Sequence, residues 1–145
     1  MTYKILSNKD VKIFEALGSG IIPGGGQHFE MGARDLSEKW LPRTDYLLSR
    51  MNLLSRTGMR FLGKLINIFW PMVYLRQFSQ MIHLPEDELV ILFHRAESSG
   101  TLSSALILLL KVLICPPFYG LKEVKESIDY KEKFPNPKNF EGIKA

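Results

Sequence analysis

The sequence predicts an all-α protein that forms a single compact domain of five to seven helices with an extended C-terminal tail. Apolar residues recur at helical spacing along most of the chain, and clusters of proline and glycine separate these segments. The length of 145 residues suits one domain, and a hydrophobic content of 46% is sufficient for a core. We expect the helical domain to cover residues 1–130 and the tail to cover residues 131–145.

The first helix is predicted over residues 8–21 or 8–22. Ser7 and Asp10 have the spacing of a capping box, with aspartate in place of the usual glutamate. The apolar residues that follow fall on one helical face: Val11, Phe14, Leu17 and Ile21. The segment 23–26, Pro-Gly-Gly-Gly, ends the helix because proline cannot donate the next backbone hydrogen bond and glycine holds a helix poorly. A loop is expected through Gly32.

Two further helices are predicted in the next part of the chain. One covers residues 33–41 and ends before Pro42, because the residue before a proline avoids helical geometry. The other begins near residues 44–45 and frays at residues 57–58. Its inward side chains are expected to be Tyr46, Leu47, Met51 and Leu54. From residue 59 to residue 70 the polar positions form one narrow stripe, consisting of Arg60, Gly63, Lys64 and Asn67, which leaves more apolar surface than an outer helix needs.

Pro71 is expected to kink or interrupt this segment, and a helical period of apolar residues continues towards His83. The segment 84–88, Leu-Pro-Glu-Asp-Glu, predicts a helix start. Proline suits the first helical position, and the three carboxylates complement the positive end of the helix dipole. That helix is expected to end at residues 98–100.

The most apolar segment predicts a central core helix over residues 102–115, capped by Thr101 and ended by the two prolines at 116–117. This stretch is too short to span a bilayer and carries Lys111, so we expect no transmembrane helix. A short helix is predicted over residues 121–128.

Charge, cysteine content and the N-terminal sequence identify no partner by themselves. The 19 Lys and Arg residues against 15 Asp and Glu residues give a formal charge of +4, a small excess. The single cysteine, Cys115, cannot form an internal disulfide and is expected to be a buried structural thiol. The first ten residues lack the pattern of a secretory signal, so the default location is the cytoplasm.

Residue types that could perform chemistry are not grouped in the sequence. The three histidines stand apart, at His28, His83 and His94, without metal-ligand spacing. The acidic run 86–88 is explained by its place at a helix start, and the glycines at 18–26 lack the βαβ context of a nucleotide-binding loop. The basic stretch 43–64 is interleaved with aliphatic residues, which disfavours binding of nucleic acid. We therefore expect no catalytic, cofactor-binding or metal-binding residue and no nucleic-acid partner.

One further feature points to a function. Residues 59–74 are apolar on nearly every side, so this segment has more hydrophobic surface than a small domain can bury. Aromatic side chains anchor many interfaces. The residues that we expect to contact a partner are Phe69, Trp70, Tyr74, Phe134 and Phe140. Alternatively, the amphipathic segment 59–74 lies on a membrane, and the chain is a membrane-surface or regulatory helical protein.

Two short motifs, one near each end of the chain, resemble those of a known family. The first begins at Leu6-Ser7 and ends at Ile21-Ile22-Pro23-Gly24, and the second runs through Pro116-Pro117-Phe118-Tyr119-Gly120 towards Asp129-Tyr130. Both are similar to segments of the gluconate 2-dehydrogenase subunit 3 family, whereas residues 31–83 match only in helical character and Asp129 stands where glycine is common. The family-matching positions are Ile22, Pro23, Phe118, Tyr119 and Tyr130.

The resemblance implies a non-catalytic small subunit of a bacterial FAD-dependent dehydrogenase whose large subunit is of the glucose-methanol-choline (GMC) type. That partner would hold the FAD, take a hydride from an alcohol or sugar, and pass electrons to a cytochrome or another acceptor. This chain would bind no cofactor and would stabilise the large subunit through an apolar interface. Many relatives carry a twin-arginine export signal, which is not visible here, so a periplasmic or membrane-associated location would require export with a partner.

Overall fold

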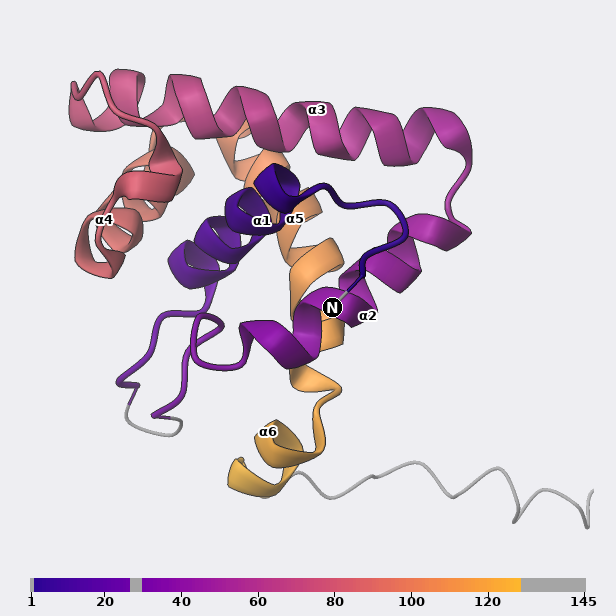
Figure 1. The fold of residues 1–145 in the computed structure, drawn as a ribbon. Coiled ribbons are helices and arrows are strands. Elements are labelled where there is room, and N and C mark those ends of the chain that lie inside the picture. Colours follow the sequence, from indigo (N-terminus) through magenta and orange to yellow (C-terminus); the bar gives the residue numbers. More distant parts are fainter. Residues whose placement is uncertain (1, 27–29, 129–145) are drawn as a thin grey trace, which may run out of the picture.

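The computed structural model describes residues 2–26 and 30–128 and confirms the all-α fold class (Figure 1). Six α-helices lie in these residues: α1 Asn8–Ile21, α2 Ser37–Arg50, α3 Leu53–Trp70, α4 Glu86–Ser98, α5 Thr101–Tyr119 and α6 Lys122–Ser127. A π-helical turn, η1 at Pro71–Leu75, and a 3-10 turn, η2 at Met81–His83, connect α3 to α4. No β-strand occurs within the described residues. The predicted tail, residues 131–145, lies outside them.

Helix α1 lies among the other helices and contacts α2, α3, α4 and α5. Helix α3 runs along one edge of the molecule, and α6 lies at the opposite end, beyond the last turn of α5 (Figure 1). The largest fully buried side chains are Phe14 of α1, Trp40 of α2 and Phe118 of α5. Three separate helices therefore supply the centre of the core.

Helix α1 has the bounds that its local signals predict. The Ser7 hydroxyl oxygen accepts a hydrogen bond from the Asp10 N–H, and the Asp10 carboxylate accepts one from the Ser7 N–H at 3.0 Å, so the capping box is complete. Near the end of the helix, a Cβ atom on Gly20 would lie 2.2 Å from the Phe93 ring. Glycine at this position allows α4 to pack closely against α1.

The prediction of two helices around Pro42 is wrong, because α2 runs without a break from Ser37 to Arg50. Pro42 removes one backbone hydrogen bond from the helix. Trp40, Leu41 and Leu48 are buried on both sides of it, and this packing holds the two halves in one helix. Burial thus outweighs the local preference of the residue before proline.

The predicted start and inward face of the third helix are also wrong. Helix α3 begins at Leu53 after Asn52, whose side-chain oxygen accepts a hydrogen bond from the Ser55 N–H at 2.7 Å, and it does not fray at residues 57–58. The four side chains expected to point inward are exposed: Tyr46 by 53%, Leu47 by 37%, Met51 by 36% and Leu54 by 84%. Tyr46 and Leu47 lie on α2 outside its buried face, and Leu54 lies in the first part of α3, where the buried residues begin only at Gly63.

Pro71 interrupts α3 as predicted, and the α-helix continues directly into the π-helical turn η1. The helical period does not continue to His83, because Arg76 has a left-handed backbone conformation with φ 54° that ends the turn. Phe78 and Met81 belong to the predicted helical period, but Phe78 is 96% exposed, whereas Met81 is fully buried. The connection to α4 is therefore a loop that Met81 and Leu84 anchor in the core.

Helix α4 confirms its predicted range, with Pro85 immediately before the first turn. Helix α5 differs from its prediction. It starts at Thr101 without a side-chain cap and continues through Pro116 and Pro117 to Tyr119. Pro117 and its neighbour Phe118 are buried, and this burial holds the last turn in place. The prolines therefore remove backbone bonds without ending the helix.

Helix α5 is only partly a core helix. One side is buried through Ile107, Leu110, Leu113 and Ile114, and the other side exposes Leu102 by 76%, Leu108 by 64% and Val112 by 64%. At 19 residues it is long and apolar enough to cross a membrane by length and composition, a test that core helices of soluble proteins also pass. The predicted stretch was too short because it stopped at the prolines. The apolar residues of α5 are therefore divided between one buried and one exposed face.

Candidate functional site

The polar stripe of α3 faces the protein interior. The Asp10 carboxylate of α1 is 1% exposed and accepts a hydrogen bond from Arg60 Nε at 2.9 Å. A second nitrogen of Arg60 lies 2.8 Å from the same carboxylate oxygen, and Lys64 Nζ lies 3.7 Å from the other. Two basic residues of α3 therefore hold the start of α1.

The same stripe positions the loop that follows η1. Asn67 is 1% exposed, its Nδ2 donates to Gln80 Oε1 at 3.2 Å, and its Oδ1 accepts from the Ile82 N–H at 3.1 Å. A Cβ atom on Gly63 would lie 3.3 Å from Ile13 Cγ2, so this position lies against α1. Because the polar positions point inward, much of the apolar surface of α3 is left outside.

The Asp10 carboxyl predicts a loss of stability in acid. Burial acts to raise its pKa, but hydrogen bonds from Ser7 and Arg60 and the charge of Arg60 outweigh burial and hold the pKa below the ordinary value of 3.8. A lowered folded-state pKa means that the stabilisation is present above pH 3.8 and is lost as the pH falls through the folded-state value. We expect the free energy of unfolding to fall below about pH 4, as measured by urea denaturation across pH.

The matched control for this prediction is Asp10→Asn, which removes the titrating group and keeps its size. This variant should be less stable than the parent at pH 7 and should show a smaller loss between about pH 5 and pH 3. Parallel pH profiles for the two proteins would contradict a role for Asp10.

A groove with a volume of about 830 Å³ lies where the end of α2, the first half of α3 and the second half of α5 meet. Its apolar lining consists of Leu47, Met51, Met59, Leu62, Leu109, Val112, Leu113 and Pro116, and its polar lining consists of Asn52 and Ser55. No charged residue is among the described residues that line it. The groove can therefore accept apolar side chains from another molecule.

Most of the groove-lining residues are not among those predicted to contact a partner. Leu109 and Val112 were assigned to the core, yet they are 44% and 64% exposed. The sequence of α5 does indicate exposed apolar residues, because its apolar side chains leave almost no polar face. A helix that packs on one side only and is apolar all round must expose apolar residues on the other side.

The predicted partner-contacting aromatic residues lie in different environments. Phe69 is 47% exposed, as an interface residue would be. Trp70 is only 7% exposed and packs edge-to-face against Tyr74 and Phe93, with ring centroids 5.7 and 5.5 Å apart, so its prediction as a surface residue is wrong. Tyr74 is half-buried, and its hydroxyl lies 2.6 Å from Ser103 Oγ. Phe134 and Phe140 lie outside the described residues.

The family-matching residues are divided between core and surface. Ile22 and Phe118 are buried, whereas Pro23 and Tyr119 are exposed. The rings of Phe118 and Tyr119 form an edge-to-face pair with centroids 5.3 Å apart. Tyr130 lies outside the described residues. Ile22 and Phe118 thus have structural roles in this fold.

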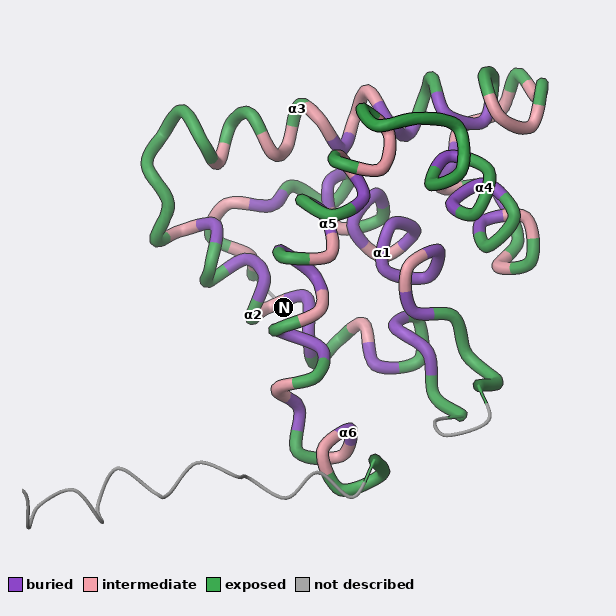
Figure 2. Tube along the Cα trace, turned by 180° about the vertical axis from the view of Figure 1, so that it is seen from behind, coloured by how far each residue is buried: buried purple, intermediate pink, exposed green. Residues whose placement is uncertain are grey.

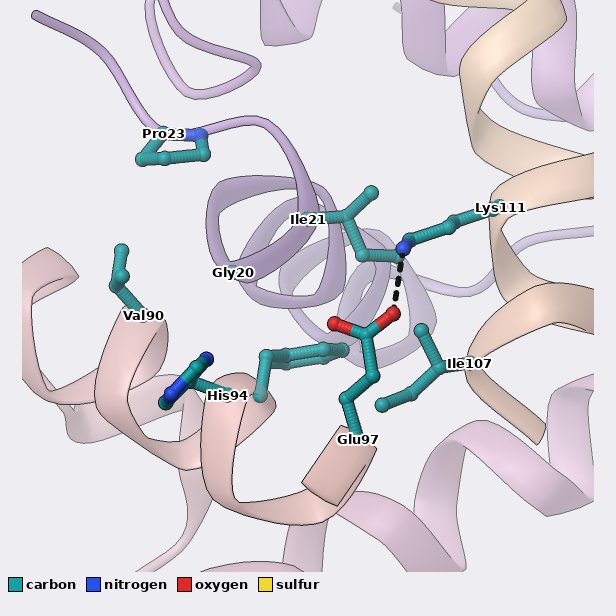
Figure 3. Close-up of a pocket in the computed structure, with 9 residues that line it drawn as sticks. Gly20, Ile21, Pro23, Val90, His94, Glu97, Ile107 and Lys111 are labelled. Atoms are coloured by element: carbon teal, nitrogen blue, oxygen red, sulfur yellow. Dashed lines mark hydrogen bonds and ion pairs between the residues drawn. The ribbon is translucent and has the colours of Figure 1, made fainter. Parts of the chain in front are cut away.

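A second, smaller pocket of about 220 Å³ lies between the end of α1, α4 and α5 (Figure 3). Lys111 Nζ donates to Glu97 Oε1 at 3.0 Å, and both side chains are partly exposed. The His94 ring lies beside Val90 rather than beside this ion pair (Figure 3). These polar groups do not converge on one point, as a general acid and base acting on one substrate would.

Cys115 is partly buried, and burial raises the pKa of its thiol against the opposing effect of Lys111. A raised pKa keeps the thiol protonated at neutral pH, which lowers its reactivity. Within residues 2–26 and 30–128, no three His, Cys, Asp or Glu side chains are grouped as metal ligands would be. His28 lies outside these residues.

Comparisons with protein-family models, with curated proteins and with solved structures find no match to the chain. The resemblance of the two end motifs to gluconate 2-dehydrogenase subunit 3 therefore stays a prediction. The groove between α2, α3 and α5 is the feature of the described residues on which we base a function.

Proposed function

We propose that this chain is a non-catalytic binding subunit that receives an apolar segment of a larger protein in the groove between α2, α3 and α5. The observation that carries this proposal is the groove itself, which exposes Leu109 and Val112 in an uncharged lining. Burying such side chains on binding contributes about 1.5–3 kcal/mol for each one fully covered. The covered area therefore supplies the binding energy without any chemistry in this chain.

The resemblance supplies the class of the partner. In this proposal the partner is the large FAD-dependent, GMC-type subunit of an alcohol or sugar dehydrogenase. The partner holds the FAD and takes the hydride, and a cytochrome or another acceptor receives the electrons. This chain binds no cofactor, covers an apolar surface of the large subunit and stabilises its fold. Its location then follows that of the partner.

The first test is recovery of the tagged chain from its native host in mild detergent, followed by mass spectrometry and a visible absorption spectrum. We expect one stoichiometric large protein and the yellow spectrum of a flavin. A colourless chain recovered alone would contradict the proposal.

The second test locates the contact in the groove. Replacing Leu109 and Val112 together with serine should weaken partner binding by about 2–3 kcal/mol, or roughly 30- to 150-fold in Kd, because both side chains are exposed before binding. The matched control replaces Val90 and Ile91 of α4, which are also exposed but lie outside the groove. Titration of the purified large subunit measures both affinities. Equal affinities for the two variants would place the contact elsewhere.

A further inference from the structure

The outer face of α3 points away from the core and carries an apolar surface in addition to the groove. Leu54, Phe61 and Ile68 are spaced by seven residues, so they lie in one row along the helix, over about 21 Å. Their exposed fractions are 84%, 61% and 50%. Figure 1 shows α3 along one edge with the other labelled helices to one side of it, and Figure 2 shows exposed positions recurring along its length.

The segment that contains α3, residues 46–85, carries positively charged side chains and no carboxylate. Between Tyr46 and Pro85 the sequence has no Asp or Glu, whereas it contains Arg50, Arg56, Arg60, Lys64 and Arg76. Lys64 is 44% exposed and lies three residues after Phe61 and four before Ile68, which places it beside the apolar row. Asp10 is the carboxylate that pairs with Arg60 and Lys64, and Arg50, Arg56 and Arg76 form no ion pair within the described residues.

We propose that the outer face of α3 docks on an anionic lipid bilayer, with the Leu54, Phe61 and Ile68 side chains in the interfacial region. The partly exposed Lys64 and the exposed Arg50 and Arg76 would lie at the headgroups, whereas Arg60 remains paired with Asp10 on the inner side of the helix. An amphipathic helix with a basic border binds such surfaces through apolar burial together with attraction to anionic lipid. The face is a convex row on a single helix, which suits a flat, deformable surface. It is distinct from the groove, where binding of the protein partner is proposed.

Charge argues against a second copy of the chain as the occupant of this face. A two-fold symmetric contact through α3 would bring the same basic segment of both copies together. Like charges held close in an interface repel one another, and no carboxylate between Tyr46 and Pro85 is present to compensate. An anionic surface instead complements the positive charges of this segment that are not paired with Asp10.

The test is co-sedimentation of the full chain with vesicles of phosphatidylcholine alone and of phosphatidylcholine mixed with phosphatidylglycerol. We expect binding to the anionic vesicles, little binding to the neutral ones, and weaker binding as salt is raised, because salt screens the headgroup charge. Replacing Phe61 and Ile68 together with serine should weaken binding by about 10-fold or more. Both positions are exposed, so circular dichroism should show an unchanged helix content.

Two controls separate this proposal from the one for the groove. The variant with Leu109 and Val112 replaced by serine should bind anionic vesicles as the parent does, while it loses the protein partner. Replacing Arg50 and Arg76, which are both exposed, with glutamine should reduce the salt dependence of vesicle binding. Absence of binding to anionic vesicles, or an undiminished affinity after replacement of Phe61 and Ile68, would overturn the proposal. Self-association that the Phe61 and Ile68 replacements abolish would assign the face to a second copy and also overturn it.

Discussion

Replacing Trp70 with alanine should lower the free energy of unfolding by about 3–5 kcal/mol, the usual cost of removing a large buried aromatic side chain. Trp70 is 7% exposed and lies edge-to-face against Tyr74 and Phe93. The substitution leaves a cavity between α3 and α4 and removes both ring contacts. Denaturation by urea, followed by far-ultraviolet circular dichroism, measures the change.

The neighbouring residue, Phe69, is a matched control for this substitution. It has a similar ring on the same helix but is 47% exposed, so its replacement with alanine should change the free energy of unfolding by less than about 1 kcal/mol. If Phe69 contacts a partner, its replacement should instead weaken binding. Similar losses of stability for the two variants would contradict the burial difference between them.

Replacing Asp45 with alanine should lower the free energy of unfolding by about 3–5 kcal/mol, because a charged acceptor of several backbone hydrogen bonds is lost. The Asp45 carboxylate is buried on α2 and accepts hydrogen bonds from three consecutive backbone N–H groups. These come from Lys4 at 2.7 Å, Ile5 at 2.9 Å and Leu6 at 2.9 Å. Without Asp45, these donors lose the acceptor that fixes the N-terminal segment.

Asp35 provides the control for this second substitution. Its exposed carboxylate accepts one backbone hydrogen bond, from the Gly32 N–H at 2.8 Å, so Asp35→Ala should cost less than about 1 kcal/mol. Hydrogen exchange should show faster exchange at Lys4, Ile5 and Leu6 in Asp45→Ala alone. A variant at Asp45 as stable as the parent would show that water replaces the carboxylate without cost.

Signals that lie within a few residues of one another predicted structure correctly. The capping box at Ser7 and Asp10 and the stop at Pro23 define α1, and the acidic first turn defines the start of α4. Prolines inside helices were misinterpreted, because Pro42 and Pro116 lie next to buried side chains that hold the helix together. The strength of that packing depends on residues far away in the sequence.

The orientation of α3 could not be predicted from its own sequence. A polar stripe on a helix usually faces solvent. Here its partner is Asp10, which is 50 residues before Arg60, and no local pattern connects the two. The groove could not be predicted from any local pattern either, because α2, α3 and α5 each supply only part of its lining. The surplus of apolar surface was visible in the sequence, whereas its location depended on how the helices pack.

The outward apolar side chains of α3 and α5 also govern the colloidal behaviour of the isolated chain. Exposed apolar patches adhere to one another, which limits the concentration at which the chain stays monodisperse. The formal charge of +4 opposes this association by repulsion. A polar substitution at Phe61 or Leu108 would improve solubility and at the same time remove contact area. Solubility of the chain alone and affinity for a covering surface are therefore opposing demands on the same side chains.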